Sequence, residues 1–227
     1  MPNLFNSHMF DGSALPLKEN MAIAVPLLER CHKNEIILEV EAGVVGGEED
    51  GHDTSGVSKD KLYTTDEDML YVYKRLSEVE NARFMFAATF GNVHGVYKPG
   101  NVELTPIILK NSQEFVKEKH GLSGKPIDFV FHGGSGSSRE QIREAIGYGV
   151  VKMNLDTDMQ WAFWDGVHAF YKQNKDYLQQ QLGNPEGDDK PNKKYYDPRV
   201  WLRSGENHFV ERLQRSFDDL NCINRNQ

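Results

Sequence analysis

A short apolar run that ends in a histidine and a glycine-rich segment constrains this chain more than any other feature. Phe129–Phe131 is typical of a strand covered on both faces of a sheet, and His132 follows it directly. Gly133–Ser138 comes next and leads into a helical pattern from Arg139. The glycines let backbone N–H groups approach an anion, and the start of a helix adds its dipole. The stretch is either a plain strand–turn–helix junction with a surface histidine, or a metal or proton-transfer group beside a phosphate-binding turn.

The composition limits the class of protein. The chain has 227 residues, enough for one large domain or two small ones, and its 38% of hydrophobic residues can build a core. A net charge of −8 argues against nucleic acid as a partner. The longest apolar runs are far below the ~20 residues of a membrane-spanning helix, so no membrane is expected. Cys31 and Cys222 lie far apart without a CxxC spacing, which favours a reducing, cytoplasmic location.

Strand and helix patterns alternate along the chain, and this alternation predicts a parallel sheet. Strands are predicted at 4–11, 35–41, 84–90, 129–131 and 149–154. Helices are predicted at 17–33 with a kink at Pro26, from a cap at Thr65, from a cap at Thr105 to about His120, and from Thr157.

Polar side chains fall at or just past the carboxyl ends of the predicted strands, at Asp11, Glu41, His94, His132 and Asn154. A (β/α)8 barrel builds its active site at that rim, whereas a doubly wound sheet gathers such groups mostly at one crevice. A barrel has eight strands and typically ~250 residues. The predicted fold is therefore α/β, a (β/α)8 TIM barrel of which this chain holds roughly the last five strands plus a C-terminal helical extension. The other strands are expected to precede Met1.

Two histidines and nearby acids have the composition of a catalytic zinc site with one open position. His94 and His132 are each followed by glycine, although a packed loop histidine is the alternative for His94. Glu39 and Glu41 alternate with an apolar residue and so face the same side of their strand. Because a buried carboxylate needs a partner, they indicate either a metal site or a layer of salt bridges.

Three further segments are candidates for substrate contacts. Gly46–Gly51 has the composition of a mobile acidic loop that brings an acid or base over a site, or of an ordinary solvated loop. The segments Gly133–Gly136, which includes Gly134, and Asn154–Thr157 follow the last two strands, where many barrels hold a phosphate. Lys98 is a second positive group or an exposed lysine. Arg199 is a phosphate clamp or part of a dimer salt bridge.

Six motifs carry a resemblance to a known family: Glu39–Glu41, Gly46–Gly51, Phe90–Asn101, Phe131–Ser137, Lys152–Asp158 and Tyr195–Trp201. Through them essentially the whole chain resembles the class II, zinc-dependent fructose-bisphosphate aldolases. The resemblance implies a single barrel domain over 1–227 that cleaves fructose 1,6-bisphosphate reversibly to dihydroxyacetone phosphate and glyceraldehyde 3-phosphate. A segment at about 177–205 resembles that of the dimeric subgroup, which implies a homodimer.

The resemblance also implies roles for individual residues. His94 and His132 resemble two of three zinc ligands, and Asp11 and Glu41 resemble the acids of a second metal position. Glu49, with Glu48 beside it, resembles the loop acid that exchanges a proton with the bound triose.

Substrate and cation contacts follow from the same resemblance. Residues that resemble the binders of dihydroxyacetone phosphate are Gly95, Gly133, Ser135, Asn154, Asp156 and Thr157. Arg199 resembles the arginine that reaches the far phosphate across a dimer. Backbone groups near Val93, Gly95 and Gly133 would hold a monovalent cation, Na⁺ or K⁺.

One part of the family pattern has no counterpart in these residues. The third zinc histidine and its neighbouring aspartate lie in the family on a strand before the one that corresponds to Leu4–Asp11. The 227-residue polypeptide alone is therefore expected to bind zinc weakly and to show little cleavage. The alternatives are an inactive or partner-dependent aldolase fragment, and a sister aldolase that acts on tagatose bisphosphate.

Overall fold

The computed structural model describes residues 3–43, 45–49, 52–53, 62–94 and 103–225. The chain divides into two compact units, Met1–Leu155 and Asp156–Gln227, which are described separately. The expectation of a single barrel domain over 1–227 stays a prediction.

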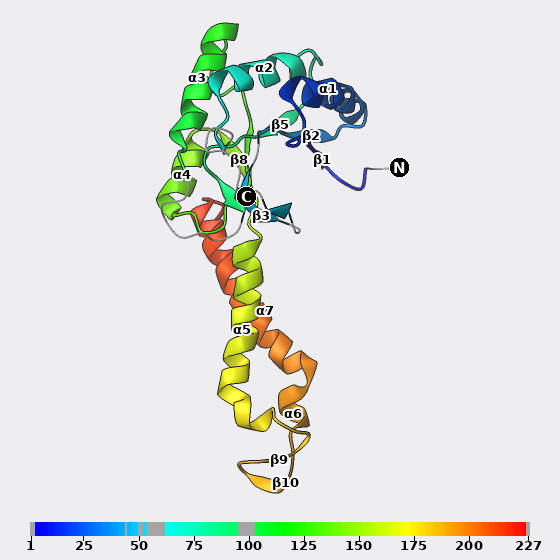
Figure 1. Cartoon of the computed structure of the whole chain (residues 1–227), viewed down its shortest axis with the longest axis vertical. Coiled ribbons are helices and arrows are strands. Elements are labelled where there is room, and N and C mark those ends of the chain that lie inside the picture. Colours follow the sequence, from blue (N-terminus) through cyan, green and yellow to red (C-terminus); the bar gives the residue numbers. More distant parts are fainter. Residues whose placement is uncertain (1–2, 44, 50–51, 54–61, 95–102, 226–227) are drawn as a thin grey trace. The chain divides into compact units, whose positions relative to one another are not determined.

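The first unit is built on a five-stranded parallel sheet (Figure 1). Its strands are β1 (Ser7–Asp11), β2 (Ile37–Glu41), β5 (Phe84–Ala87), β7 (Phe129–Phe131) and β8 (Val150–Met153). They pair in the order β1-β2-β5-β7-β8, and every pair is parallel. The predicted parallel sheet is confirmed. The spatial order follows the chain order without the reversal of a doubly wound sheet, which is consistent with the arrangement of a barrel.

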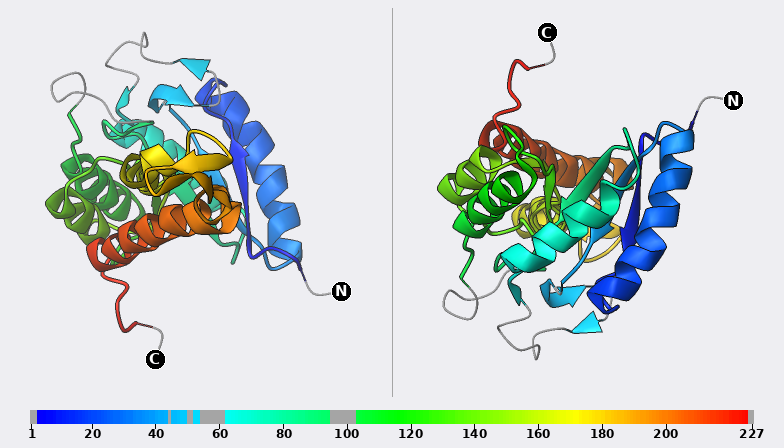
Figure 2. Two further views of the ribbon diagram at one scale, coloured as in Figure 1. Left: turned by 90° about the horizontal axis from the view of Figure 1, so that it is seen from below. Right: turned by 90° about the horizontal axis from the view of Figure 1, so that it is seen from above.

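Four helices connect these strands: α1 (Leu17–Lys33), α2 (Asp66–Leu76), α3 (Ile107–His120) and α4 (Arg139–Gly147). Helix α1 has the predicted bounds and contains Pro26. Thr65 and Ser138 each form a capping box, with Asp68 and Gln141, and so fix where α2 and α4 begin. Successive helices contact one another, and α1 lies alongside β1 and β2 (Figure 2).

Several predicted bounds were wrong. Strand β1 begins at Ser7, and β5 ends at Ala87. Thr105 does not cap α3, because its hydroxyl donates to the carbonyl oxygen of Glu103 and Pro106 occupies the N-cap position. The predicted end at Gly121 is confirmed, since that residue adopts the left-handed conformation with φ 62°.

The acidic segment predicted as a loop contains two short strands. Strands β3 (Gly46–Glu49) and β4 (His52–Asp53) join β6 (Val93–His94) in a second sheet of order β4-β3-β6. Backbone pairing between β3 and β6, which are distant in sequence, outweighs the loop-like composition of the segment.

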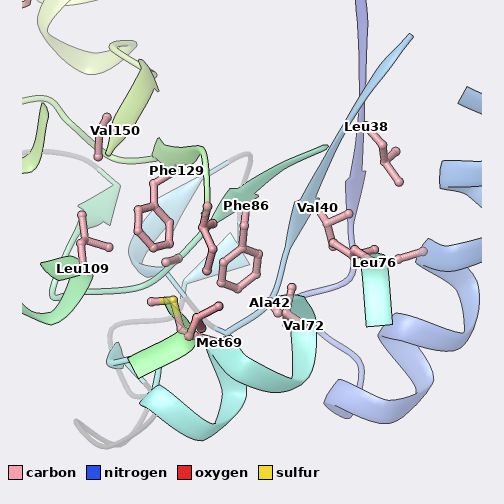
Figure 3. Packing of buried hydrophobic residues seen from close by; sticks show 14 of the residues in the cluster. Leu38, Val40, Ala42, Met69, Val72, Leu76, Phe86, Leu109, Phe129 and Val150 are labelled. Carbon is pink, nitrogen blue, oxygen red and sulfur yellow. The ribbon is translucent and has the colours of Figure 1, made fainter. Parts of the chain in front are cut away.

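The two faces of the main sheet differ in chemistry. Leu38, Val40, Phe86 and Phe129 pack against helix residues such as Leu109 in the main hydrophobic core (Figure 3). The opposite face carries a smaller apolar cluster formed by Met85, Ala87 and Val130. Because strand side chains alternate, Glu39 and Glu41 belong to this second face and not to the helix-covered core.

The second unit is a helical hairpin with a small β-ribbon. It contains α5 (Thr157–Asn174), a 3-10 turn at 175–177, β9 (Leu182–Asn184), β10 (Gly187–Pro191), α6 (Lys193–Tyr196) and α7 (Pro198–Asp219). Helices α5 and α7 pack closely, and a Cβ added at Gly166 would lie 2.4 Å from the carbonyl oxygen of Ser204. Asn192 is fully buried and donates to the carbonyl oxygens of Gln180 and Gly183. Among the described residues, no helix has both the length and the apolar character needed to cross a membrane.

Candidate functional site

Two buried carboxylates lie side by side on β2. Glu39 is 1% exposed and Glu41 5% exposed, although both side chains are charged at neutral pH in water. A buried carboxylate is costly unless it is paired, so each of these groups requires a partner.

His132 is the partner that they share. Its Nε2 lies 2.8 Å from Glu39 Oε1, and its Nδ1 lies 3.0 Å from Glu41 Oε2. Lys152, on β8, donates from Nζ to the second Glu39 oxygen at 2.6 Å. Glu39, Glu41, His132 and Lys152 are called the His132 cluster below.

The pKa values of His132 and Glu39 are both shifted by their contact. Burial alone would lower the pKa of His132, but hydrogen bonds to Glu39 and Glu41 outweigh it and raise this pKa to about 9. Burial would likewise raise the pKa of Glu39, yet hydrogen bonds from His132 and Lys152 bring it below the ordinary value. His132 is therefore protonated at neutral pH, between the side chains of Glu39 and Glu41.

Buried amides hold the backbone around the cluster. Asn92 donates from Nδ2 to the carbonyl oxygen of His132 at 2.9 Å, while its Oδ1 accepts from the N–H of Phe90. Asn20, which is fully buried in α1, donates to the carbonyl oxygen of Glu41 at 2.8 Å. These bonds fix the strand ends from which the histidine and one carboxylate project.

The glycine-rich turn brings the ends of β7 and β8 together. Gly133 and Gly136 have φ of 61° and 80°, which glycine adopts without strain. The N–H of Gly134 donates to the carbonyl oxygen of Asn154 at 3.1 Å. A Cβ at Gly134 would lie 2.2 Å from Met153 Cε and 3.1 Å from the carbonyl oxygen of Asn154, so a larger residue there would displace the end of the Met153 side chain. Asn154, the first residue of the predicted segment Asn154–Thr157, therefore lies against the glycine turn that follows His132.

For the other predicted site residues of the first unit, the structure gives either a contact away from the His132 cluster or the backbone position alone. Asp11 is in register with Glu41, but its side chain is exposed and accepts from the N–H of Ser13. The backbones of Gly47 and His94 pair between β3 and β6, which also contains Val93. The side chains of His94, Glu48 and Glu49 lie outside the described part of the structure, as do Gly95 and Lys98.

In the second unit, the predicted substrate-binding side chains have local partners. The Asp156 carboxylate accepts from Gln160 Nε2 at 2.8 and 2.9 Å, and Thr157 opens α5. The Arg199 side chain is 87% exposed, and its guanidinium donates hydrogen bonds from Nε and Nη2 to the Asp197 carboxylate at 2.9 and 2.5 Å. This fork lowers the pKa of Asp197 to about 2 and raises the pKa of Arg199.

The His132 cluster contains imidazole and carboxylate groups, which are kinds of ligand that zinc binds. Each ring nitrogen has a carboxylate oxygen 2.8–3.0 Å away. Two ligands of a tetrahedral zinc, each bonded at about 2.0–2.1 Å, are separated by about 3.3 Å. If zinc replaced the proton on one ring nitrogen of His132, the ring and the facing carboxylate would need to move apart by only a few tenths of an ångström. Among the described residues alone, no group of three or more histidine, cysteine or acidic side chains is arranged around a metal position.

Sequence reasoning did not single out Lys152 or Asn92 as part of the site. A lysine within the predicted strand 149–154, two residues before Asn154, was an available signal, because alternation puts both on one face. The sequence offered a metal site or a layer of salt bridges as reasons for a buried Glu39. Its contacts with His132 and Lys152 are such salt bridges.

A chain-ordered parallel sheet with a histidine–carboxylate cluster at its carboxyl edge defines an α/β protein of barrel-like strand order. Residues 1–225 match the family model described as fructose-bisphosphate aldolase class-II. The chain therefore belongs to the class II fructose-bisphosphate aldolase family.

Individual relatives agree with this assignment. A fructose-bisphosphate aldolase of Campylobacter jejuni is 59% identical over 224 residues, which cover 98% of this chain and 63% of the relative. One from Haemophilus influenzae is 61% identical over 220 residues, 97% of this chain and 61% of the relative. The crystal structure of a C. jejuni fructose-bisphosphate aldolase superimposes with a TM-score of 0.84 at 56% identity, over 98% of this chain and 62% of that one. The chain thus spans less than two thirds of the length of these relatives.

Proposed function

We propose that the protein takes part in the zinc-dependent, reversible aldol cleavage of fructose 1,6-bisphosphate to dihydroxyacetone phosphate and glyceraldehyde 3-phosphate, as a lyase of glycolysis and gluconeogenesis. The observation that carries the proposal is His132, held between two buried carboxylates at the carboxyl end of β7 and followed by the glycine turn. Identity of 59–61% to relatives named fructose-bisphosphate aldolase supports the choice of substrate.

His132 and His94 would hold the zinc ion, and Glu41 with Asp11 would supply acids for a second metal position. When bound, zinc acts as a Lewis acid that stabilises the enediolate left by aldol cleavage. Glu49, assisted by Glu48, would exchange the proton with the triose carbon. Burial of the cluster helps, because charge stabilisation is stronger where water is excluded.

The glycine turn would bind the triose phosphate. Gly133, Ser135 and the positive N-terminal end of α4 would face the anion. The N–H of Gly134 bonds to the carbonyl oxygen of Asn154 and so holds Asn154 beside them. The other proposed substrate contacts are Gly95, Lys98, Asp156 and Thr157, and a Na⁺ or K⁺ ion would bind near Val93, Gly95 and Gly133. Arg199 would reach the second phosphate of the substrate across a dimer interface once its guanidinium group releases the Asp197 carboxylate.

The finer structural expectations belong to the same proposal. The five parallel strands would be part of an eight-stranded barrel. The other strands would correspond to the part of the relatives that the match does not cover. The segment at about 177–205 would contribute to a homodimer of the dimeric subgroup, in the cytoplasm. The 227-residue chain alone would then bind zinc weakly and turn over slowly.

The test measures fructose 1,6-bisphosphate cleavage by two proteins in zinc and in EDTA. One is the 227-residue chain, and the other is this chain fused to the part of the C. jejuni aldolase that the match leaves uncovered. The fused protein is expected to cleave in a zinc-dependent manner that His132→Ala abolishes, while the chain alone has little activity. A folded, zinc-loaded fused protein without cleavage would refute the function. A parallel assay with tagatose 1,6-bisphosphate decides between the two substrates.

A further inference from the structure

The pair formed by Glu39 and Lys152 has no role in the chemistry proposed above. Glu39 is among the most deeply buried side chains, and both of its carboxylate oxygens are occupied, one by His132 and one by Lys152. Strands β5 and β7 lie between β2 and β8 in the sheet, so Lys152 extends across two strands to reach this carboxylate. The Lys152 side chain is 42% exposed, whereas the Glu39 side chain that it contacts is 1% exposed.

The two carboxylates beside His132 are not equivalent. Glu39 faces Nε2 and is fixed on its other side by a lysine. Glu41 faces Nδ1, and within the described part of the chain its carboxylate pairs with His132 only. Glu41 can therefore turn toward an incoming ion, whereas any movement of Glu39 would break its bond to Lys152.

We propose that Glu39 and Lys152 are positioning residues that make Nδ1 the metal-binding nitrogen of His132. Glu39 accepts the N–H of Nε2, which leaves the lone pair of the neutral ring on Nδ1, the nitrogen that faces Glu41. A carboxylate behind a metal-binding histidine fixes the ring and increases its basicity. Lys152 holds the second Glu39 oxygen and compensates a charge that would otherwise be buried alone. This inference rests on the proposed function, because it requires His132 to bind zinc.

The alternative is that the pair only stabilises the fold. Removing one partner of a buried ion pair destabilises a protein in either case, whereas replacing both by apolar residues is often neutral for stability. The double variant Glu39→Met/Lys152→Met therefore separates the two roles. A structural pair predicts unchanged zinc binding in this variant, and a positioning pair predicts weaker binding.

The experiment titrates the fused protein of the proposed test with zinc, because the 227-residue chain alone is expected to bind the ion weakly, and it follows two quantities. Zinc Kd is measured by competition with a chromophoric chelator, and the ¹⁵N shifts of the His132 ring show which nitrogen binds the ion. The wild-type fused protein is expected to bind through Nδ1 with Nε2 protonated. Zinc Kd should rise about 10–100-fold in Glu39→Gln and in the double variant. Lys152→Arg should lie closer to wild type than Lys152→Met, and the exposed Lys110→Met is the matched control without effect.

The outcomes separate this inference from the proposed function. Zinc bound through Nε2, or a Kd within twofold of wild type in folded Glu39→Gln and in the double variant, overturns the inference alone. Ring shifts of His132 that do not respond to zinc in the wild-type fused protein overturn both the inference and the proposed zinc site.

Discussion

The protonation of His132 makes the stability of the metal-free chain depend on pH. This pKa is 6.5 in an unfolded chain and about 9 in the folded one. Because the folded pKa is raised, the stabilising contribution is fully present below pH 6.5 and is lost as the pH rises toward 9. One pKa unit corresponds to 1.36 kcal/mol, so the contribution is about 3 kcal/mol in total.

The assay is urea unfolding in EDTA at constant ionic strength from pH 6 to pH 9. The free energy of unfolding is expected to fall by up to about 1.4 kcal/mol per pH unit within this window. His132→Gln should remove this slope, while slopes from other groups remain common to both proteins. Glu41→Gln, which removes one of the two hydrogen-bonding carboxylates, should reduce it in part.

An NMR titration of the His132 ring keeps the test independent of how well these variants fold. Its midpoint is expected near 9 in the wild-type chain. A midpoint near 6.5, or equal pH slopes in wild type and a folded His132→Gln, would refute the geometry of the cluster.

Three further predictions concern the fold, each measured by urea unfolding. Phe129→Ala removes a fully buried ring and should cost about 3–5 kcal/mol; a loss below about 1 kcal/mol would contradict the described core. Gly91→Ala should cost more than about 1 kcal/mol, because φ is +88° and the new Cβ would lie 2.1 Å from the carbonyl oxygen of Glu103. The control Gly147→Ala meets no atom within 4 Å and should be neutral or stabilising, so equal losses at both glycines would count against this reasoning. Thr65→Ala removes the α2 cap and should cost about 1 kcal/mol, and an unchanged stability would speak against the capping box.

Local signals account for the parts of the fold that the sequence predicted well. Helix α1 has its predicted bounds, because apolar periodicity and helix propensity act within the segment itself. The end of α3 at Gly121 followed from the freedom of glycine to adopt positive φ. The alternation of such segments was sufficient to predict a parallel sheet.

Pairings between distant residues account for what was missed. Glu39 meets His132 across 93 residues of sequence and Lys152 across 113, and no local pattern encodes such contacts. Pairing with β6 likewise converts the acidic segment into strand β3. The histidine at the end of β7 was visible in the sequence, but only the folded sheet supplies the two carboxylates that surround it.

Anomalous diffraction at the zinc edge, from crystals of the chain grown with zinc, tests the central claim most directly. The account predicts a zinc peak about 2.0–2.1 Å from a ring nitrogen of His132, beside the glycine turn. A zinc peak elsewhere, with His132 still held between Glu39 and Glu41, would contradict it.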